Sequence, residues 1–386
     1  MSKIMTIQIF EETLRDGLQS CNFSNLSIED KKNIIILFDR LGIEACNLGF
    51  INSSVRENDE IIELISFIKS KQLRIEPYVI CRMKTSDLEE VNCISKKLEI
   101  KISSLLYIGV SRKRMYIEGW DEIYIYDAIF KVLNFAKDHE MQVSIALEDS
   151  TRMDEKFLKK IISLINDFPV YSIALADTLG ISDYEQTLKL VSFVKKRLRG
   201  NIIIEWHGHN DLGLAVSNSL AAIKGGAKRI HTCMLGIGER CGNTSTEQLL
   251  INLYMKNELS SNIHMKELRK IVKLLQNKLK IDIPKNYPCF GEYSFFTCAG
   301  THGAAIYKEN ILDDNRISVF TPYIPQVLGR TMEVGVNRTS GEGNIKYLNS
   351  KYSLGLDEKK IKNILEYVKC NNLFFNEKEF VHFVKS

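Results

Sequence analysis

The chain has 386 residues, 45% of them hydrophobic and 26% charged, with a formal net charge of +4 at pH 7. This is the composition of a soluble globular protein, and no apolar run approaches the ~18 residues of a membrane span. Because the basic residues form no long run, nucleic-acid binding is not indicated. The nine cysteines include no C-x-x-C pair, and MSKIMTIQIFEE carries no signal-peptide core, so we expect a cytoplasmic protein with reduced thiols.

Short β-rich runs alternate with stretches of helical periodicity over residues 1–256. The predicted strands are TIQIFEET (6–13), EACNLGF (44–50), RIEPYVI (74–80), SSLLYIGV (103–110), QVSIALEDS (142–150), YSIALADT (171–178), NIIIEWHGH (201–209) and KRIHTCMLG (228–236). The helices predicted between them include 28–41, 121–139, 183–198, 213–225 and 244–256. Ser27, Asp121 and Asp183 precede three of these helices as capping residues.

This alternation predicts right-handed βαβ units and a parallel sheet. Eight units in about 250 residues match the size of a (β/α)8 TIM barrel. A doubly wound open sheet is the alternative, but it usually has fewer strands, and no G-x-G-x-x-G follows the first strand. We therefore expect an α/β fold with a catalytic barrel over residues 1–258.

The pattern breaks after residue 257. A Lys/Leu-rich helical stretch (265–281) is followed by a Gly/aromatic segment (289–310), a loop with two prolines (320–330) and a predicted terminal helix pair near 345–384. We expect residues 259–386 to form a small, mostly helical C-terminal subdomain that covers the active site.

Polar and charged groups gather where the predicted strands end. They are TLRD (13–16), EDS (148–150), DT (177–178), HGHND (207–211) and GIGERCGN (236–243). In a barrel the catalytic residues lie at the carboxyl ends of the strands. A barrel used only as a scaffold would not need polar groups at so many ends of one face, so this face is predicted to hold the active site.

Two of these histidines are spaced for metal binding. Residues i and i+2 of a strand point to the same face, so His207 and His209 would offer two imidazoles to one ion. Asp16 adds a carboxylate and Asn243 could add a carbonyl oxygen, and this mixed set suits a divalent ion such as Zn, Mn, Co, Fe or Mg. Arg15 would reach the same pocket only if the chain bends after the first strand.

Six motifs together resemble the family of 2-isopropylmalate, homocitrate and citramalate synthases, metal-dependent TIM barrels that also include hydroxymethylglutaryl-CoA lyase. Three lie in the barrel, TLRDGLQ (13–19), HGHNDLGLAVSNSLAAIKGGA (207–227) and GIGERCGN (236–243). Three follow it, THGAAIYK (301–308), FTPYIP…GR (320–330) and SGEGNIKY (340–347). The resemblance covers nearly the whole chain and implies condensation of an acyl-CoA, usually acetyl-CoA, with a 2-oxo acid, followed by thioester hydrolysis.

The resemblance also implies roles in the barrel. Asp16, His207 and His209 would bind the divalent metal, with Asn243 a direct or near ligand, and Arg15 would stabilise the charge that develops on oxygen. Four further residues are predicted to bind substrate, namely Gln19, Glu148, Thr178 and Arg114.

Beyond the barrel, His302 and Tyr323 resemble a pair implicated in proton transfer. They would act over the barrel of the partner subunit in a homodimer whose subdomains are exchanged.

Two features depart from the family pattern. Leu18 gives R-D-G-L-Q, the form familiar from the lyase, where the synthases usually read R-D-G-E-Q. Few residues follow SGEGN, so we expect no leucine-sensing domain and no response to leucine.

The sequence does not decide which 2-oxo acid is the substrate. GFINSSVREND (49–59) resembles isopropylmalate and citramalate synthases, whereas Arg112, Lys113 and Arg114 could bind CoA phosphates or the distal carboxylate of a homocitrate- or citrate-type substrate. A metal-dependent aldolase or lyase of the same barrel type, and a non-catalytic binding homologue, are the further alternatives.

Overall fold

The computed structural model describes residues 7–20, 23, 26–312 and 319–386. The expectation that no signal peptide precedes the first strand concerns residues 1–6, which lie outside the described part of the chain. The chain divides into two compact units, Met1–Ile281 and Asp282–Ser386, which are described separately below. No helix among the described residues is long and apolar enough to cross a membrane.

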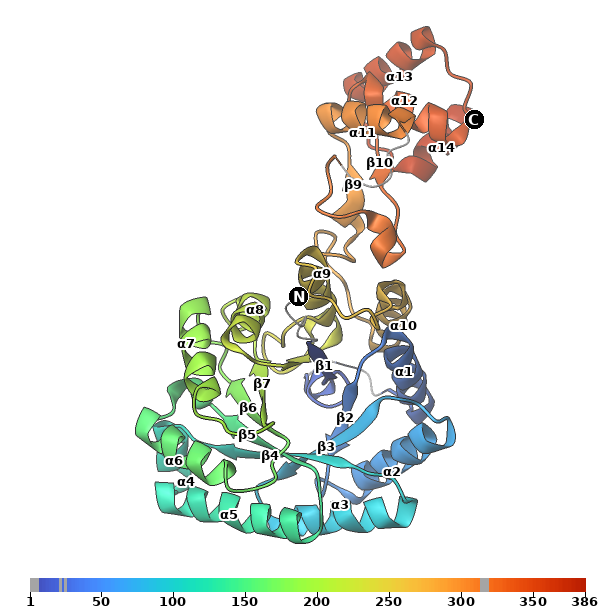
Figure 1. The fold of residues 1–386 in the computed structure, drawn as a ribbon. Coiled ribbons are helices and arrows are strands. Elements are labelled where there is room, and N and C mark those ends of the chain that lie inside the picture. The colour runs from blue at the N-terminus through green and yellow to red at the C-terminus, as the bar shows by residue number, and fades with distance from the viewer. Residues whose placement is uncertain (1–6, 21–22, 24–25, 313–318) are drawn as a thin grey trace. The chain divides into compact units, whose positions relative to one another are not determined.

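The first unit is a closed barrel of eight parallel strands in sequential order, as predicted (Figure 1). Its register runs from Phe10 opposite Ala45 on the neighbouring strand to Ile9 opposite Ile230, which closes the barrel between the first and last strands. The strands are β1 Gln8–Glu11, β2 Ala45–Phe50, β3 Glu76–Arg82, β4 Ser103–Gly109, β5 Val143–Glu148, β6 Ser172–Asp177, β7 Ile203–Gly208 and β8 Arg229–Thr232.

Helices surround the barrel and start at the capping residues that the sequence contains. Ser27 and Asp183 each form a capping box, with Asp30 and Gln186 respectively, and Asp121 accepts a hydrogen bond from the Tyr124 amide. The helices are α1 Ile28–Leu41, α2 Val55–Ser70, α3 Thr85–Leu98, α4 Arg112–Glu118, α5 Glu122–Asp138, α6 Glu155–Ile165, α7 Tyr184–Lys195, α8 Ala215–Gly225 and α9 Thr246–Met255.

The barrel interior is packed with side chains rather than open. A buried layer of apolar residues crosses it, contributed by six different strands: Phe10, Ala45, Tyr78, Leu105, Ala146 and Ala174. Three of the six are alanines, and two of them, Ala146 on β5 and Ala174 on β6, line a cavity that is open at the strand ends.

The barrel unit extends beyond the boundary expected at residue 258. The helix α10 (Leu268–Leu279) buries Leu268, Ile271 and Leu275 completely and packs against α1. An ion pair of 2.9 Å between Lys278 and Asp30 joins the same two helices. Because α10 is amphipathic and its apolar face needs a partner, it completes the barrel unit rather than opening the subdomain.

The second unit is mostly helical, as predicted. It holds α11 Gly300–Leu312, α12 Glu342–Tyr352, α13 Glu358–Cys370 and α14 Glu377–Lys385, so three helices replace the predicted terminal pair. Two short parallel strands, β9 Phe296–Thr297 and β10 Glu333–Val334, were not predicted because two residues carry no periodicity. The core of this unit includes Val334, Val336, Ile345, Leu348 and Phe380.

Candidate active site

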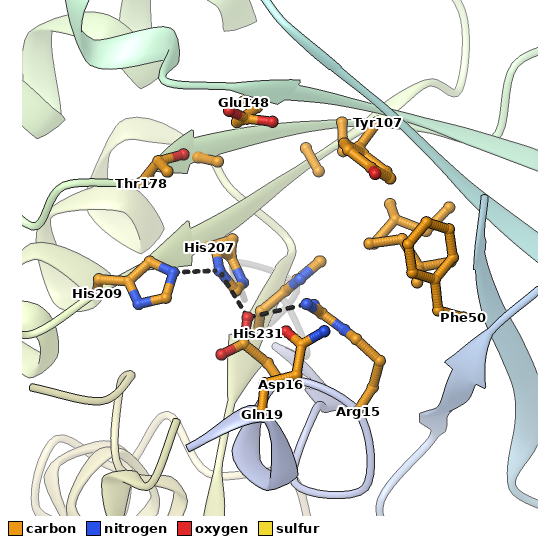
Figure 2. Close-up of a pocket in the computed structure, with 15 residues that line it drawn as sticks. Arg15, Asp16, Gln19, Phe50, Tyr107, Glu148, Thr178, His207, His209 and His231 are labelled. Carbon is orange, nitrogen blue, oxygen red and sulfur yellow. Dashed lines mark hydrogen bonds and ion pairs between the residues drawn. The ribbon is translucent and has the colours of Figure 1, made fainter. Parts of the chain in front are cut away.

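A cavity of about 270 Å³ opens at the carboxyl ends of the barrel strands (Figure 2). Seven of the residues predicted for catalysis, substrate or metal line it: Arg15, Asp16, Gln19, Glu148, Thr178, His207 and His209. The remainder of its wall is Phe50, Ile80, Leu105, Tyr107, Ala146, Ala174, Ala176 and His231. The tertiary structure thus brings together predicted residues that lie up to 194 positions apart in the sequence, from Arg15 to His209.

A turn after β1 places Arg15 and Asp16 side by side in the pocket. The strand ends at Glu11, and the amides of Arg15 and Gly17 both donate to the Glu12 carbonyl, at 3.1 and 3.0 Å. The predicted run 6–13 is therefore longer than the strand itself. Because the chain bends here, Arg15 does not point to the opposite face, as an extended strand would require.

His207 and His209 face each other across the end of β7. Their Nε2 atoms lie 3.2 Å apart, and the Nε2 atom of His207 lies 3.7 Å from Oδ2 of Asp16 (Figure 2). Candidate ligand atoms of these three residues all lie within 4.8 Å of one another. Asn243 lies directly beside them, because its Nδ2 atom donates to Oδ1 of Asp16 at 2.8 Å.

The protonation states of this group suit a cation. Burial and the neighbouring His209 lower the pKa of His207 well below its usual value, and burial also lowers the pKa of His209. Burial alone would raise the pKa of Asp16, but Arg15 and the two histidines lower it below its usual range. Two neutral imidazoles and a carboxylate are therefore available as electron-pair donors near neutral pH.

Two buried acceptor or donor atoms beside this group are without a hydrogen-bond partner among the described residues, namely Oδ1 of Asn243 and Nδ1 of His209. Buried polar atoms are almost always paired, so an unpaired carbonyl oxygen next to Asp16 fits a metal ligand. The donor set of two nitrogens and two oxygens fits a divalent metal ion with positions left for a substrate.

A second buried group lies beneath the first. Glu12, His207 and His231 also place ligand atoms within 4.8 Å of one another. However, the Glu12 carboxylate lies 2.7 Å from the Arg15 guanidinium, and His231 lies 2.7 Å from Glu205. Because these charges are already compensated, we do not assign a metal ion here. Glu12 and His231 were not predicted as site residues, although the i, i+2 spacing in β8 (Arg229, His231) could have indicated a polar barrel interior.

Glu148 and Thr178 lie on the opposite wall from Arg15. Burial raises the pKa of Glu148, with Arg114 acting in the opposite direction. The Thr178 hydroxyl accepts a hydrogen bond of 2.8 Å from the Asp149 amide, which fixes its position at the end of β6.

The two arginines after β4 are engaged with carboxylates. Arg114 lies 3.0 Å from Glu118 and 3.7 Å from Glu148, and it does not line the cavity. Arg112 forms an ion pair of 2.6 Å with Asp154, outside the pocket. None of Arg112, Lys113 and Arg114 is among the described residues that line the cavity, and the predicted role of Arg114 in binding substrate stays a prediction.

His302 and Tyr323 belong to the second unit. His302 lies in the first turn of α11, stacks on Phe320 at 3.8 Å between ring centroids, and has its Nδ1 atom 3.3 Å from the Thr297 hydroxyl. The hydroxyl oxygen of Tyr323 lies 3.5 Å from the sulfur of Cys289, and burial raises the pKa of this phenol. Their predicted role at a barrel of the partner subunit stays a prediction.

The barrel sequence matches a known family. Residues 6–275 match the HMGL-like family. The chain belongs to this family. It is similar to the homocitrate synthase AksA of Methanothermobacter thermautotrophicus, with 27% identity over 98% of this chain and 93% of that protein. It is also similar to a probable 2-isopropylmalate synthase of Archaeoglobus fulgidus, with 28% identity over 96% of this chain and 70% of that protein.

The fold of this HMGL-like family member agrees with solved structures. The HMG-CoA lyase of Bacillus subtilis superposes with a TM-score of 0.61 and 18% identity, over 72% of this chain and 96% of that one. The resemblance inferred from the motifs is confirmed by these matches. The protein is an enzyme of the acyltransferase type represented by the synthases of its family.

Proposed function

We propose that this enzyme condenses acetyl-CoA with a 2-oxo acid that has an apolar side chain, and that the resulting thioester is hydrolysed to release CoA. The methyl carbon of the acetyl group forms a bond to the ketone carbon, and water then cleaves the thioester. The observation that carries this proposal is the position of Asp16, His207 and His209 at the rim of a cavity whose deeper wall is apolar.

A divalent metal ion held by Asp16, His207 and His209, with Asn243 as a direct or near ligand, would supply Lewis-acid polarisation of the ketone. The neutral imidazoles and the ionised Asp16 carboxylate support this assignment, because a metal ligand must offer a free electron pair. The unpartnered Oδ1 atom of Asn243 supports it independently.

The chain's own residues account for the binding and charge stabilisation that the reaction needs. The Thr178 hydroxyl and the Gln19 amide line the pocket and are assigned to the carboxylate of the 2-oxo acid. The Arg15 guanidinium stays charged, because Glu12 and Asp16 raise its pKa even though burial lowers it. It is therefore assigned to the negative charge that develops on the ketone oxygen, where preorganised donors contribute most to the rate.

The cavity wall supports an apolar substrate side chain. Phe50, Ile80, Leu105, Ala146 and Ala174 contribute hydrocarbon to it, and its aromatic Tyr107 lies beside Phe50 at 5.8 Å between ring centroids.

The alternative substrates 2-oxoglutarate and oxaloacetate carry a second carboxylate, which would need a cation in this apolar part. Arg82, at the end of β3, is held by Asp87 at 2.7 Å, and the arginines after β4 are ion-paired as described above. An isopropylmalate-type reaction is therefore favoured over a homocitrate- or citrate-type one.

Proton removal from the acetyl methyl group is assigned to His302 assisted by Tyr323, acting on the barrel of a partner subunit in a homodimer. A histidine exchanges protons near neutral pH, and the buried Tyr323 phenol remains a hydrogen-bond donor because its pKa is raised.

The test is release of free CoA thiol from acetyl-CoA with a panel of 2-oxo acids, after metal removal and readdition of Mg²⁺, Mn²⁺, Zn²⁺ or Co²⁺. We expect 2-oxoisovalerate to exceed pyruvate, 2-oxoglutarate and oxaloacetate in kcat/KM. A preference for 2-oxoglutarate would reject the apolar-substrate proposal. Absence of thiol release with every acid and metal would reject the condensing activity.

A further inference from the structure

Carboxylates alternate with basic side chains down the barrel interior from the site. Arg15 pairs with Glu12 at 2.7 Å, Glu12 lies 3.2 Å from Nδ1 of His231, and Nε2 of His231 lies 2.7 Å from Glu205. Glu205 in turn lies 3.2 Å from Arg229. This set of five residues is called the interior charge chain below.

All five members are withdrawn from solvent. The side chains of Glu12, His231, Glu205 and Arg229 are at most 2% exposed, and that of Arg15 is 10% exposed. Burying a charge is costly unless it is paired and hydrogen-bonded, so each member lowers the cost of burying its neighbours. Two members, Arg15 and His231, also line the catalytic pocket.

Glu12 holds Arg15 through two nitrogens. The Nε and Nη2 atoms of Arg15 both contact Oε2 of Glu12, at 2.8 and 2.7 Å, whereas Nη1 donates to Oδ2 of Asp16 at 2.9 Å. The other oxygen of Glu12, Oε1, lies 3.2 Å from Nδ1 of His231, although these two atoms do not meet the geometry of a hydrogen bond.

The two carboxylates compete for the same guanidinium. Without Glu12, the nearest remaining anion is Asp16, which is already assigned to the metal ion. A guanidinium prefers to engage a carboxylate through two parallel hydrogen bonds. Arg15 released from Glu12 would therefore turn onto Asp16 and away from the oxygen of the ketone.

We propose that Glu12 is a positioning residue for Arg15: its buried carboxylate, which lies against His231, keeps the guanidinium aimed at the reacting oxygen and prevents it from turning fully onto Asp16. This inference rests on the proposed condensation for its kinetic consequence, but its structural consequence is independent of the reaction. Glu12 itself acts through Arg15 and does not touch the substrate.

The kinetic test is a double-mutant cycle with Glu12→Leu and Arg15→Met in the metal-loaded enzyme. Because removing one donor to an oxyanion costs about 10²–10³ in kcat, we expect Glu12→Leu to lower kcat by about 100-fold, with KM for the 2-oxo acid changed less than about threefold. In the Arg15→Met background the same substitution should change kcat less than about twofold, since its target is gone. An equal loss of kcat in both backgrounds would overturn the proposal.

Glu205→Gln is the matched control, because Glu205 is also buried and also contacts His231, but has no contact with Arg15 among the described residues. We expect it to lower the free energy of unfolding while kcat stays within about threefold of wild type. A loss of kcat equal to that of Glu12→Leu would show a general need for charge in the barrel, and would overturn the specific role of Glu12.

A crystal structure of Glu12→Leu tests the inference without any assay. We expect two nitrogens of the Arg15 guanidinium, instead of Nη1 alone, to contact the Asp16 carboxylate, whereas an unmoved guanidinium would overturn the proposal even if the enzyme is active. If Glu12→Leu does not fold, the isosteric Glu12→Gln replaces it in both tests, with an expected kcat loss of about tenfold, because one acceptor oxygen remains. If wild-type enzyme releases no thiol, the proposed function fails and the crystallographic result still decides the role of Glu12.

Discussion

The Nε2 atoms of His207 and His209 lie 3.2 Å apart at the end of β7, with the Asp16 carboxylate 3.7 Å from the first of them. Two imidazole nitrogens that face each other this closely repel one another unless a proton or a cation lies between them. Burial lowers the pKa of both histidines, and in their neutral forms either one ring donates its N–H to the other or both offer lone pairs to a shared cation, as proposed above.

The first prediction concerns this metal site. His207→Ala should release the metal ion and abolish turnover, because one of three ligands is lost, while the barrel stays folded. Metal content per chain, measured by mass spectrometry of the purified protein beside its circular dichroism spectrum, checks both parts. Full metal occupancy in the folded variant would show that His207 is not a metal ligand.

The second prediction uses a close backbone approach. A Cβ atom on Gly238 would lie 2.1 Å from Nδ2 of Asn243 and 2.9 Å from Oδ1 of Asp16. Gly238→Ala should therefore displace both side chains and weaken Mn²⁺ binding by at least about tenfold. A tenfold loss of affinity corresponds to ~1.4 kcal/mol of binding free energy, which a displaced ligand is expected to cost.

Gly213→Ala is the control for this change. Gly213 also has a positive φ, +74°, but its Cβ position has no atom within 4 Å among the described residues. That variant should lose about 1 kcal/mol of stability through backbone strain and keep its Mn²⁺ affinity. Equal Mn²⁺ affinities in the two variants would show that Asn243 does not contribute to metal binding.

The third prediction concerns substrate size. Ala146→Leu should lower kcat/KM for 2-oxoisovalerate by about 10-fold or more and for pyruvate less than about threefold, because the added methyl groups occupy the space for the larger side chain. Ala45→Leu adds the same volume to the same interior layer but does not face the cavity, so it should leave the ratio of the two kcat/KM values unchanged. If Ala146→Leu left the ratio of the two kcat/KM values unchanged, the substrate side chain would not lie against Ala146.

The fourth prediction concerns pH. Glu11 is completely buried, and burial raises its pKa from 4.5 to about 7 despite hydrogen bonds from Thr13 and Thr246. In the unfolded chain the carboxyl ionises near 4.5, so ionisation favours unfolding between pH 4.5 and 7. The stability contributed by neutral Glu11 is thus fully present below pH 4.5 and is lost as the pH rises to about 7.

Comparison with Glu11→Gln isolates this group, since other titrating groups are shared by both proteins. The free energy of unfolding of wild type, minus that of the variant, should fall by ~3 kcal/mol between pH 4.5 and 7.5. Urea unfolding at both pH values measures it. A difference that does not depend on pH would mean that Glu11 titrates normally in the folded protein.

The fifth prediction concerns the second unit. His302→Ala should lower kcat by about 10²–10⁴-fold with metal content unchanged, as expected for loss of a general base. His382→Ala, an exposed histidine of α14, should leave kcat unchanged.

Subunit exchange tests where His302 acts. Mixtures of inactive His302→Ala and inactive His207→Ala chains should recover up to about a quarter of wild-type activity if each site takes residues from both subunits, because one intact site forms in each mixed dimer. No recovery, with exchange shown by mass spectrometry, would mean that each chain completes its own site.

Local patterns in the sequence were enough to predict the barrel and the polar groups that meet at its strand ends. Strand–helix alternation is a local property that depends on periodicity and capping, so eight βα units could be read along the chain. The H-x-H spacing places two imidazoles on one face by strand geometry alone. Since all strands of a parallel barrel end at one face, the polar ends of different strands could be expected to meet.

Other features depended on contacts between distant residues. The bend after Glu11 that brings Arg15 beside Asp16 is held by backbone hydrogen bonds to the Glu12 carbonyl. The extent of the first unit was decided by the packing of α10 on α1, which no local signal contains. The ion pairs that engage Arg114 and the pairing of Glu12 with His231, 219 positions later, arise only when the barrel closes. Buried charge pairs are fixed by tertiary neighbours rather than by periodicity, and this is why the interior charge chain could not be predicted from the sequence.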